Sequence, residues 1–122
     1  MSTLLLIGLG GGIGAMARYG LSLITVNSAF PFMTFITNIL GALCIGIIVG
    51  IGNDKQLSKD IILPIKTGFC GGFTTFSTFS LEMLTLIQNR QYFAGISYAL
   101  LSVILCIVGV YIGLTISHKI CA

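Results

Sequence analysis

Residues 67–80 read TGFCGGFTTFSTFS and decide the fold, because they place weak helix formers inside an apolar segment. Gly71 and Gly72 weaken a helix at this point, and five of the seven residues from 74 to 80 carry hydroxyl groups. A break at membrane depth frees backbone carbonyls, which are tolerated only when they are buried in protein or line a cavity. We therefore expect a helix interrupted at Gly71–Gly72. Its freed carbonyls could bind a cation, and the start of the resumed helix could favour an anion. The alternative is a kinked packing helix whose hydroxyls bond to its own carbonyls.

The composition of the whole chain is that of a membrane protein. The 122 residues are 56% hydrophobic and only 7% charged, whereas a soluble domain carries about 25% charged residues. A soluble fold this short could not hide so much apolar surface, so a lipid bilayer is the expected surrounding. The net charge of +3 comes from six basic and three acidic residues. These charges are too few and too scattered for a nucleic-acid-binding surface.

Four apolar segments are each close to or above the roughly 20 residues that span a bilayer. They cover roughly residues 4–26, 33–51, 61–87 and 93–117. The polar separators between them are short, so consecutive helices run antiparallel and no second domain fits. Pro64 falls near the start of the third segment, where we expect it in the first helical turn. The sequence predicts an all-α fold, a single transmembrane domain over residues 1–122 with four helices, the third of which is broken.

The basic residues give only a small bias in orientation. One side of the membrane receives Lys55, Lys59, Lys66 and Lys119, and the other receives Arg18 and Arg90. By the positive-inside rule the termini are cytoplasmic, but a chain inserted in both orientations would explain the near balance.

Glycines at GxxxG spacing offer faces for close helix packing. They are the pairs Gly8/Gly12, Gly10/Gly14, Gly46/Gly50 and Gly109/Gly113. Four helices are few to enclose a polar pathway, so we expect self-association through some of these faces. The alternative is that the glycines only pack helices within one chain.

Several polar residues in the apolar segments recur at helical spacing. Asn38 lies one turn after Thr34, and its mid-span amide needs partners inside the protein; an interhelical structural bond is an equal alternative to a pore-lining role. Tyr98, Ser102 and Cys106 form a second stripe, because residues four apart share a helix face.

Aromatic and charged residues complete the candidate site. Phe76 and Phe79 share one face, and the electropositive edges of their rings could face a small anion; core packing is the alternative. Glu82 lies one turn after Thr78 and could guard a vestibule or sit at the water interface. Arg18, inside the first segment, could attract anions or stabilise the fold.

No enzyme is indicated. The single histidine, His118, has no Ser/His/Asp or Cys/His arrangement around it in the sequence, so the groups needed for hydrolysis are lacking. The four cysteines include no CxxC pair, which gives a zinc site or a disulfide framework little support.

The chain resembles the CrcB/Fluc family of bacterial fluoride channels over essentially its whole length. Three stretches carry the resemblance: GGIGAMARY at residues 11–19, then Phe30-Pro31 with Thr34 and NILG at residues 38–41, and GFCGGFTTFSTFS at residues 68–80. The third is long and highly specific, and the other two support it. The chain departs from the family at Met33, where glycine is usual, and at Cys106, where a hydroxyl often continues the stripe.

The resemblance implies a fluoride-specific channel for passive export, built as an antiparallel, dual-topology homodimer in the bacterial plasma (inner) membrane. It implies a central structural sodium ion held by the backbone carbonyls of Gly71 and Thr74 from each subunit. The fluoride pathway would use Asn38, Phe76, Phe79, Ser77, Thr78, Tyr98 and Ser102. Arg18 and Glu82 would match the family's arginine and vestibule acid.

Two other functions fit parts of the sequence. A proton-coupled small multidrug-type transporter also has four helices, but it needs a central membrane-embedded carboxylate, and the first segment has none. A non-transporting membrane scaffold could be held together by the glycine faces alone.

Overall fold

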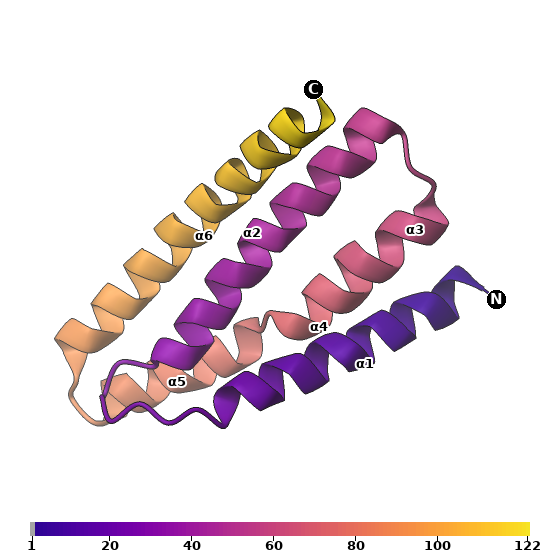
Figure 1. The fold of residues 1–122 in the computed structure, drawn as a ribbon. Coiled ribbons are helices and arrows are strands. Elements are labelled where there is room, and N and C mark those ends of the chain that lie inside the picture. The colour runs from indigo at the N-terminus through magenta and orange to yellow at the C-terminus, as the bar shows by residue number, and fades with distance from the viewer. Residues whose placement is uncertain (1) are drawn as a thin grey trace.

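The computed structural model describes residues 2–122 and is helical throughout (Figure 1), with no strand in that range. The elements are α1 (Thr3–Ser22), α2 (Phe32–Lys55), α3 (Lys59–Leu63), a π-helical stretch η1 (Pro64–Cys70), α4 (Gly71–Phe73), α5 (Phe76–Gln88) and α6 (Tyr92–Cys121). Three of them, α1, α2 and α6, are long and apolar enough to cross a membrane. The third predicted segment corresponds to α3, η1, α4 and α5 taken together. The prediction of an all-α fold is confirmed.

The helix bounds differ from those predicted, and local hydrogen bonds mark the C-terminal ends of α1 and α2. α1 stops at Ser22 instead of residue 26, where the Ser22 hydroxyl donates to the Tyr19 carbonyl at 2.5 Å. α2 continues past residue 51 to Lys55, where Gln56 adopts a left-handed conformation with φ of 53°. The N–H of Leu57 then bonds back to the Gly52 carbonyl at 3.0 Å and closes the turn. α6 extends beyond the predicted 93–117 at both ends.

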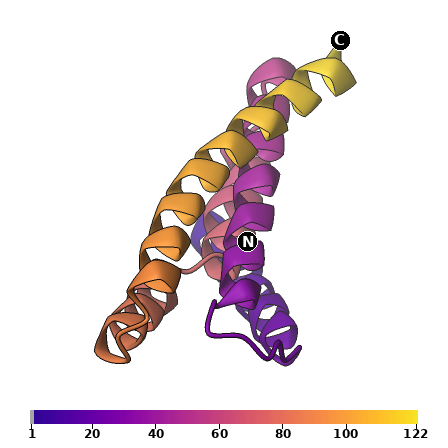
Figure 2. The same cartoon turned by 90° about the vertical axis from the view of Figure 1, so that its left-hand side faces the viewer.

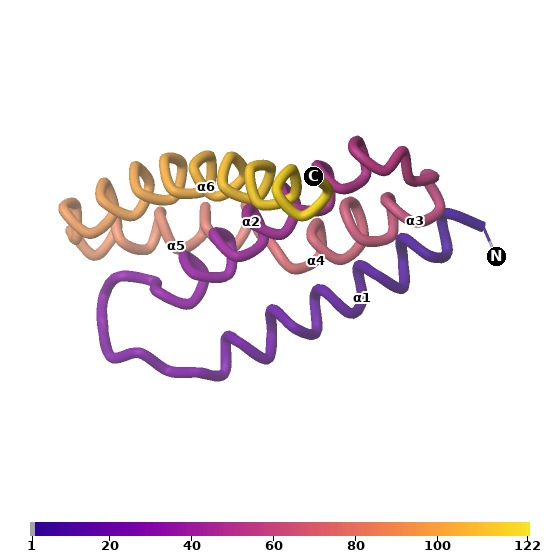
Figure 3. Tube along the Cα trace, turned by 45° about the horizontal axis from the view of Figure 1, so that its top comes forward, coloured from indigo at the N-terminus to yellow at the C-terminus, as the bar shows by residue number. Residues whose placement is uncertain are grey.

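The helices form two packed pairs joined through α2. α2 lies against α6, and α1 lies against η1 and α4. α2 also contacts η1, so it stands between α6 and the first part of the broken segment (Figures 1 and 3). α5 packs on α6. Figure 2 shows α5 and the start of α6 on one side of the molecule and α1 on the other.

The break in the third segment lies later than predicted. Gly71 and Gly72 are helical, and the chain becomes extended at Thr74 (φ −85°, ψ 157°) and Thr75 (φ −150°, ψ 122°). Gly72 serves close packing instead, because a Cβ there would clash with the backbone of Gly11 on α1. The expectation of a break at Gly71–Gly72 was therefore wrong by a few residues.

Pro64 also lies outside the first turn of its segment. α3 supplies five residues before it, and Pro64 opens the π-helical stretch. Proline has no N–H to donate to the carbonyl of Asp60, four residues earlier. The chain continues in the wider π-type turn, a feature often found at functional sites.

Most of the glycine pairs are used inside the chain. A Cβ at Gly10 or Gly14 would clash with backbone of η1, and one at Gly46 or Gly113 would clash across the α2–α6 contact. Only Gly8 and Gly12, among the four pairs, have nothing within 4 Å of such an atom. Three of the four pairs therefore pack helices within one chain, which was the alternative to self-association. The Gly8/Gly12 pair lies on an open face of α1.

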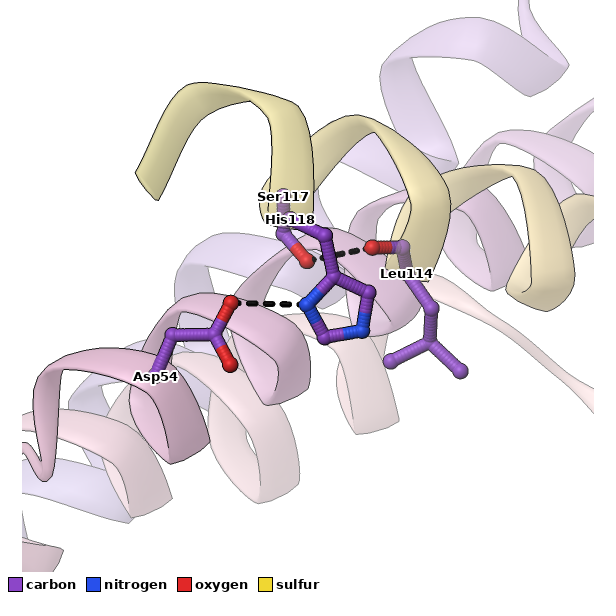
Figure 4. A network of polar contacts seen from close by, with 4 residues as sticks. All are labelled: Asp54, Leu114, Ser117 and His118. Carbon is purple, nitrogen blue, oxygen red and sulfur yellow. Dashed lines mark hydrogen bonds and ion pairs between the residues drawn. The ribbon is translucent and has the colours of Figure 1, made fainter. Parts of the chain in front are cut away.

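Polar contacts join the segment ends near the turn over residues 56–58. His118 Nδ1 lies 2.7 Å from Asp54 Oδ2, which ties the end of α6 to the end of α2 (Figure 4). In the same view the Ser117 hydroxyl donates to the Leu114 carbonyl at 2.7 Å. The Thr3 hydroxyl donates to Asp60. The N-terminal end of α1 and the C-terminal end of α6 therefore lie at the same end of the molecule, as the antiparallel prediction requires.

The close approach of α1 and η1 can be tested with two matched glycines. We expect Gly14→Ala to destabilise the protein by about 1–3 kcal/mol, because the added methyl overpacks against the Phe69 carbonyl. Gly20→Ala, also on α1, gains the same helix propensity but meets open space. The fraction of monodisperse protein after heating in detergent measures both, and equal losses would contradict the proposed packing.

Candidate functional site

The break in the third segment is held by the side chain of Asn38 on α2. The N–H of Thr75 donates to Asn38 Oδ1 at 2.9 Å, and Asn38 Nδ2 donates to the Thr75 carbonyl at 3.1 Å. The amide thus satisfies both backbone groups of a residue that has left the helix. The sequence left two roles open for Asn38, an interhelical structural bond and a pore-lining group. These two hydrogen bonds are the interhelical structural bond. Nδ2 carries two hydrogens, so one N–H of the Asn38 amide takes no part in the bonds to Thr75.

Thr75 also starts the resumed helix, although it was not among the predicted site residues. Its hydroxyl oxygen accepts from the N–H of Thr78 at 3.1 Å and lies 3.3 Å from the Ser77 hydroxyl. Threonine is a favoured N-cap residue. That preference, applied to the point where the apolar pattern restarts, could have indicated Thr75.

These bonds leave two carbonyls of the third segment without their helical donors. In a continuous helix the N–H of Thr75 would bond to the Gly71 carbonyl, and the N–H of Thr78 would bond to the Thr74 carbonyl. Both N–H groups are directed elsewhere, to Asn38 and to the Thr75 hydroxyl. The two freed carbonyls are those predicted to hold sodium, so the backbone fits a cation of this kind.

The Gly72 carbonyl has a different partner. It accepts from Nε of Arg18 at 3.1 Å. Arg18 is therefore bound to the backbone beside the break. It braces α1 against α4, which matches the expectation that it stabilises the fold.

A cavity of about 370 Å³ opens beside the break, between α2, the third segment and α6. Six of the predicted site residues line it: Asn38, Gly71, Thr74, Phe76, Phe79 and Ser102. The hydroxyl of Ser102 is buried and has no hydrogen-bond partner among the described residues, and Ser102 itself is only 7% exposed. A buried hydroxyl without a partner is costly, and Ser102 is one of the residues that line the cavity.

Phe76 and Phe79 stand as a pair at this cavity. Their ring centroids are 5.5 Å apart and the rings are tilted by 33°. Phe76 is 79% exposed, so core packing within this chain does not explain its position. The predicted shared face of the two rings is confirmed.

Tyr98 lies outside the cavity, in an aromatic cluster. It is fully buried, and its ring packs against those of Phe30, Phe35 and Phe79 at centroid distances from 4.9 to 6.3 Å. Its hydroxyl donates to Glu82 Oε1 at 3.1 Å. The stripe of Tyr98, Ser102 and Cys106 does face inward, but only its last two members reach the cavity.

A second hollow of about 410 Å³ lies on the other side of Thr75. Arg18, Thr34, Thr37 and Thr78 contribute its polar lining, together with Thr75. Ser77 is exposed and lines neither of these hollows. Of the two residues predicted for the vestibule, Arg18 lines this second hollow, whereas Glu82 lines neither hollow and accepts from the Tyr98 hydroxyl.

The apolar helices and the broken third segment beside them define a multi-pass membrane protein. The family model described as CrcB-like protein, Camphor Resistance (CrcB), matches residues 5–114. The chain therefore belongs to the CrcB family, and the resemblance read from residues 68–80 is confirmed.

The similar proteins include many that carry the name fluoride-specific ion channel FluC, among them the following three. The protein from Shewanella denitrificans is 41% identical over 116 residues, which cover 93% of this chain and 94% of the relative. The protein from Phocaeicola vulgatus is 42% identical over 121 residues, with 97% and 100% covered. The protein from Methanococcus aeolicus is 38% identical over 121 residues, with 98% of each chain covered.

The different bonding of Asn38 and Ser102 predicts different effects on stability. We expect Asn38→Ala to lower stability by about 1–3 kcal/mol, because it leaves the Thr75 backbone groups without partners. Ser102→Ala should leave stability unchanged or raise it, since the hydroxyl has no partner to lose. Thermal unfolding of both variants in one detergent is the measurement. A large loss with Ser102→Ala would show that the hydroxyl is bonded in the folded protein and would contradict this difference.

Proposed function

We propose that this chain is a fluoride-specific ion channel, which lets fluoride leave the cell passively across the inner membrane and so lowers its cytoplasmic concentration. The observation that carries the proposal is the cavity in which the unpartnered Ser102 hydroxyl, the Asn38 amide and the Phe76–Phe79 pair meet. The names of the relatives support fluoride as the ion. No catalytic residue is needed for this function.

Fluoride is small and strongly hydrated, so a pore must replace its water with other donors. The Ser102 hydroxyl is one such donor, and the free N–H of Asn38 is a second. The positive edges of the two phenylalanine rings can face the ion where hydroxyls are lacking. No carboxylate of the described residues lines the cavity, so none of them repels an anion there.

The pathway continues, in this proposal, through the remaining predicted residues. Thr78 offers a hydroxyl in the second hollow, close to the cation of Arg18. Ser77 stands at the exposed start of α5. Tyr98 can donate to the ion only by releasing Glu82, so these two residues would act as a switchable pair on the route.

The proposed structural sodium ion would bind the carbonyls of Gly71 and Thr74. The support is that the N–H groups that would bond to both carbonyls in a continuous helix bond elsewhere, and that Gly71 and Thr74 line the cavity. When bound, the ion supplies fixed positive charge near the pathway. Two oxygens are fewer than a sodium ion coordinates, so a second copy would complete the coordination.

In a homodimer, the second subunit would also pack against the exposed parts of the site. Phe76 projects from the chain with 79% of its surface uncovered, and a Cβ added at Gly71 would meet nothing within 4 Å. An antiparallel, dual-topology pair would bring two equivalent breaks together across a central axis. This arrangement remains part of the proposal, and Gly8 and Gly12 are the glycines left open for contacts beyond the chain.

The central experiment is fluoride efflux from proteoliposomes. We expect wild-type protein to release fluoride and not chloride, and Ser102→Ala or Phe76→Ile to reduce the rate by at least about tenfold, which corresponds to roughly 1.4 kcal/mol in the barrier. Both variants should elute from size-exclusion chromatography like wild type. Absence of fluoride release by folded wild-type protein would refute the function.

The same assay separates the other two functions. A scaffold would release no fluoride, and its self-association would survive Phe76→Ile. A proton-coupled small multidrug-type transporter would move organic cations and would need a central carboxylate, but the first acid in the chain is Asp54.

Sodium dependence is a separate prediction. We expect protein purified in N-methylglucamine instead of sodium to lose flux and dimer stability together, and sodium to restore both. Potassium, which is larger, serves as the control cation. Full flux after exhaustive removal of sodium would contradict the structural ion and leave the channel function intact.

A further inference from the structure

Lys66 occupies a position that the proposed pathway does not yet use. It lies on η1 and is the only charged residue lining the 370 Å³ cavity among the described residues. It also lines a smaller hollow of about 170 Å³ beside the turn over residues 56–58. Lys66 therefore lies between the cavity and the end of the molecule at which α1 begins and α6 ends.

The ammonium group of Lys66 is not neutralised within the described chain. It is exposed, and no ion pair or hydrogen bond reaches it among residues 2–122. The three acids of the chain have other partners: Asp54 pairs with His118, Asp60 accepts from Thr3, and Glu82 accepts from Tyr98. The positive charge is thus available to an ion in the cavity.

In the third segment, Lys66 is the first of three cavity-lining residues that follow the helix toward the break. Lys66, Cys70 and Thr74 follow one another at four-residue spacing, and all three line the cavity. The facing wall includes the apolar residues Ala42, Ile45 and Val103. A lone charge beside low-dielectric walls focuses its field along such a cleft and concentrates ions of opposite sign.

We propose that Lys66 is an anion-attracting residue at one mouth of the cavity, which raises the local concentration of fluoride and passes it toward Asn38 and Ser102. This inference rests on the proposed channel function and adds an electrostatic step to it. The role needs positive charge at this position and no particular hydrogen-bond geometry. Arginine should therefore replace lysine, whereas a neutral or acidic side chain should not.

The test compares charge variants at two lysines of the same end. Lys66→Gln, Lys66→Glu and Lys66→Arg are assayed with Lys59→Gln, which removes an equal charge from a residue that lines only the smaller hollow. Loop charge can change the orientation of the protein in the membrane. Because Lys59→Gln removes the same charge from the same end, comparison with it separates this effect from a role of Lys66 in the cavity. Initial fluoride efflux is measured at low, subsaturating fluoride, in low salt and in about 1 M salt of impermeant ions, where the Debye length falls to about 3 Å.

We expect Lys66→Gln to slow efflux about tenfold in low salt, Lys66→Glu to slow it further, and Lys66→Arg to keep the wild-type rate. The difference between wild type and Lys66→Gln should shrink in high salt, and Lys59→Gln should behave like wild type throughout. Lys66→Gln at the wild-type rate in low salt would overturn the inference while the channel function stands. So would a loss that Lys66→Arg fails to restore or that persists in high salt, since either indicates a structural role. Wild-type protein without flux would refute the channel function itself and the role of Lys66 with it.

Discussion

The double hydrogen bond between the Asn38 amide and the backbone of Thr75 is the contact on which the rest of the structure depends. An extended residue at membrane depth exposes an N–H and a carbonyl that lipid cannot satisfy, at a cost of several kcal/mol each. Asn38 supplies one donor and one acceptor in the spacing that a neighbouring backbone would offer. The break is therefore stable without water, and it needs α2 beside it. Because the N–H of Thr75 is used in this way, the carbonyl of Gly71, a residue that lines the cavity, loses its helical donor.

α1 holds the same break from the other side. Arg18 binds the Gly72 carbonyl, and Gly14 lets the α1 backbone approach η1 and α4 closely. The interruption is thus fixed between two helices, one acting through an amide and the other through a guanidinium. Arg18 is bound to the backbone and is not a free surface charge. From the sequence alone it was counted with Arg90 on one side of the membrane, and that count overstates the free positive charge on this side. The features that support the proposed dimer are instead the exposed ring of Phe76 and the open space beside Gly71.

The sequence predicted what depends on the amount and spacing of apolar residues. Segment lengths indicated the all-α fold, hydroxyl density indicated the broken third segment, and the mid-span amide of Asn38 had to have partners inside the protein. The position of the break was missed because glycine content indicates where a helix is weak, while Gly72 is needed for contact with Gly11. The roles of Thr75 and the pairing of Tyr98 with Glu82 depend on contacts between segments, which spacing along one helix does not contain.

The geometry at the break also bears on which groups can meet an anion. The start of a helix attracts negative charge through its free N–H groups, and the sequence suggested this use for α5. The Thr75 hydroxyl already accepts from Thr78, so this N-terminus is partly satisfied by its own cap. Ser102, by contrast, presents a buried hydroxyl with no partner among the described residues. The unmet hydrogen-bond donors of the cavity are therefore the Ser102 hydroxyl on α6 and one N–H of Asn38 on α2, whereas the freed carbonyls belong to the third segment. A cation at those carbonyls and an anion near Ser102 can then occupy the same region, because separate elements supply the two kinds of group.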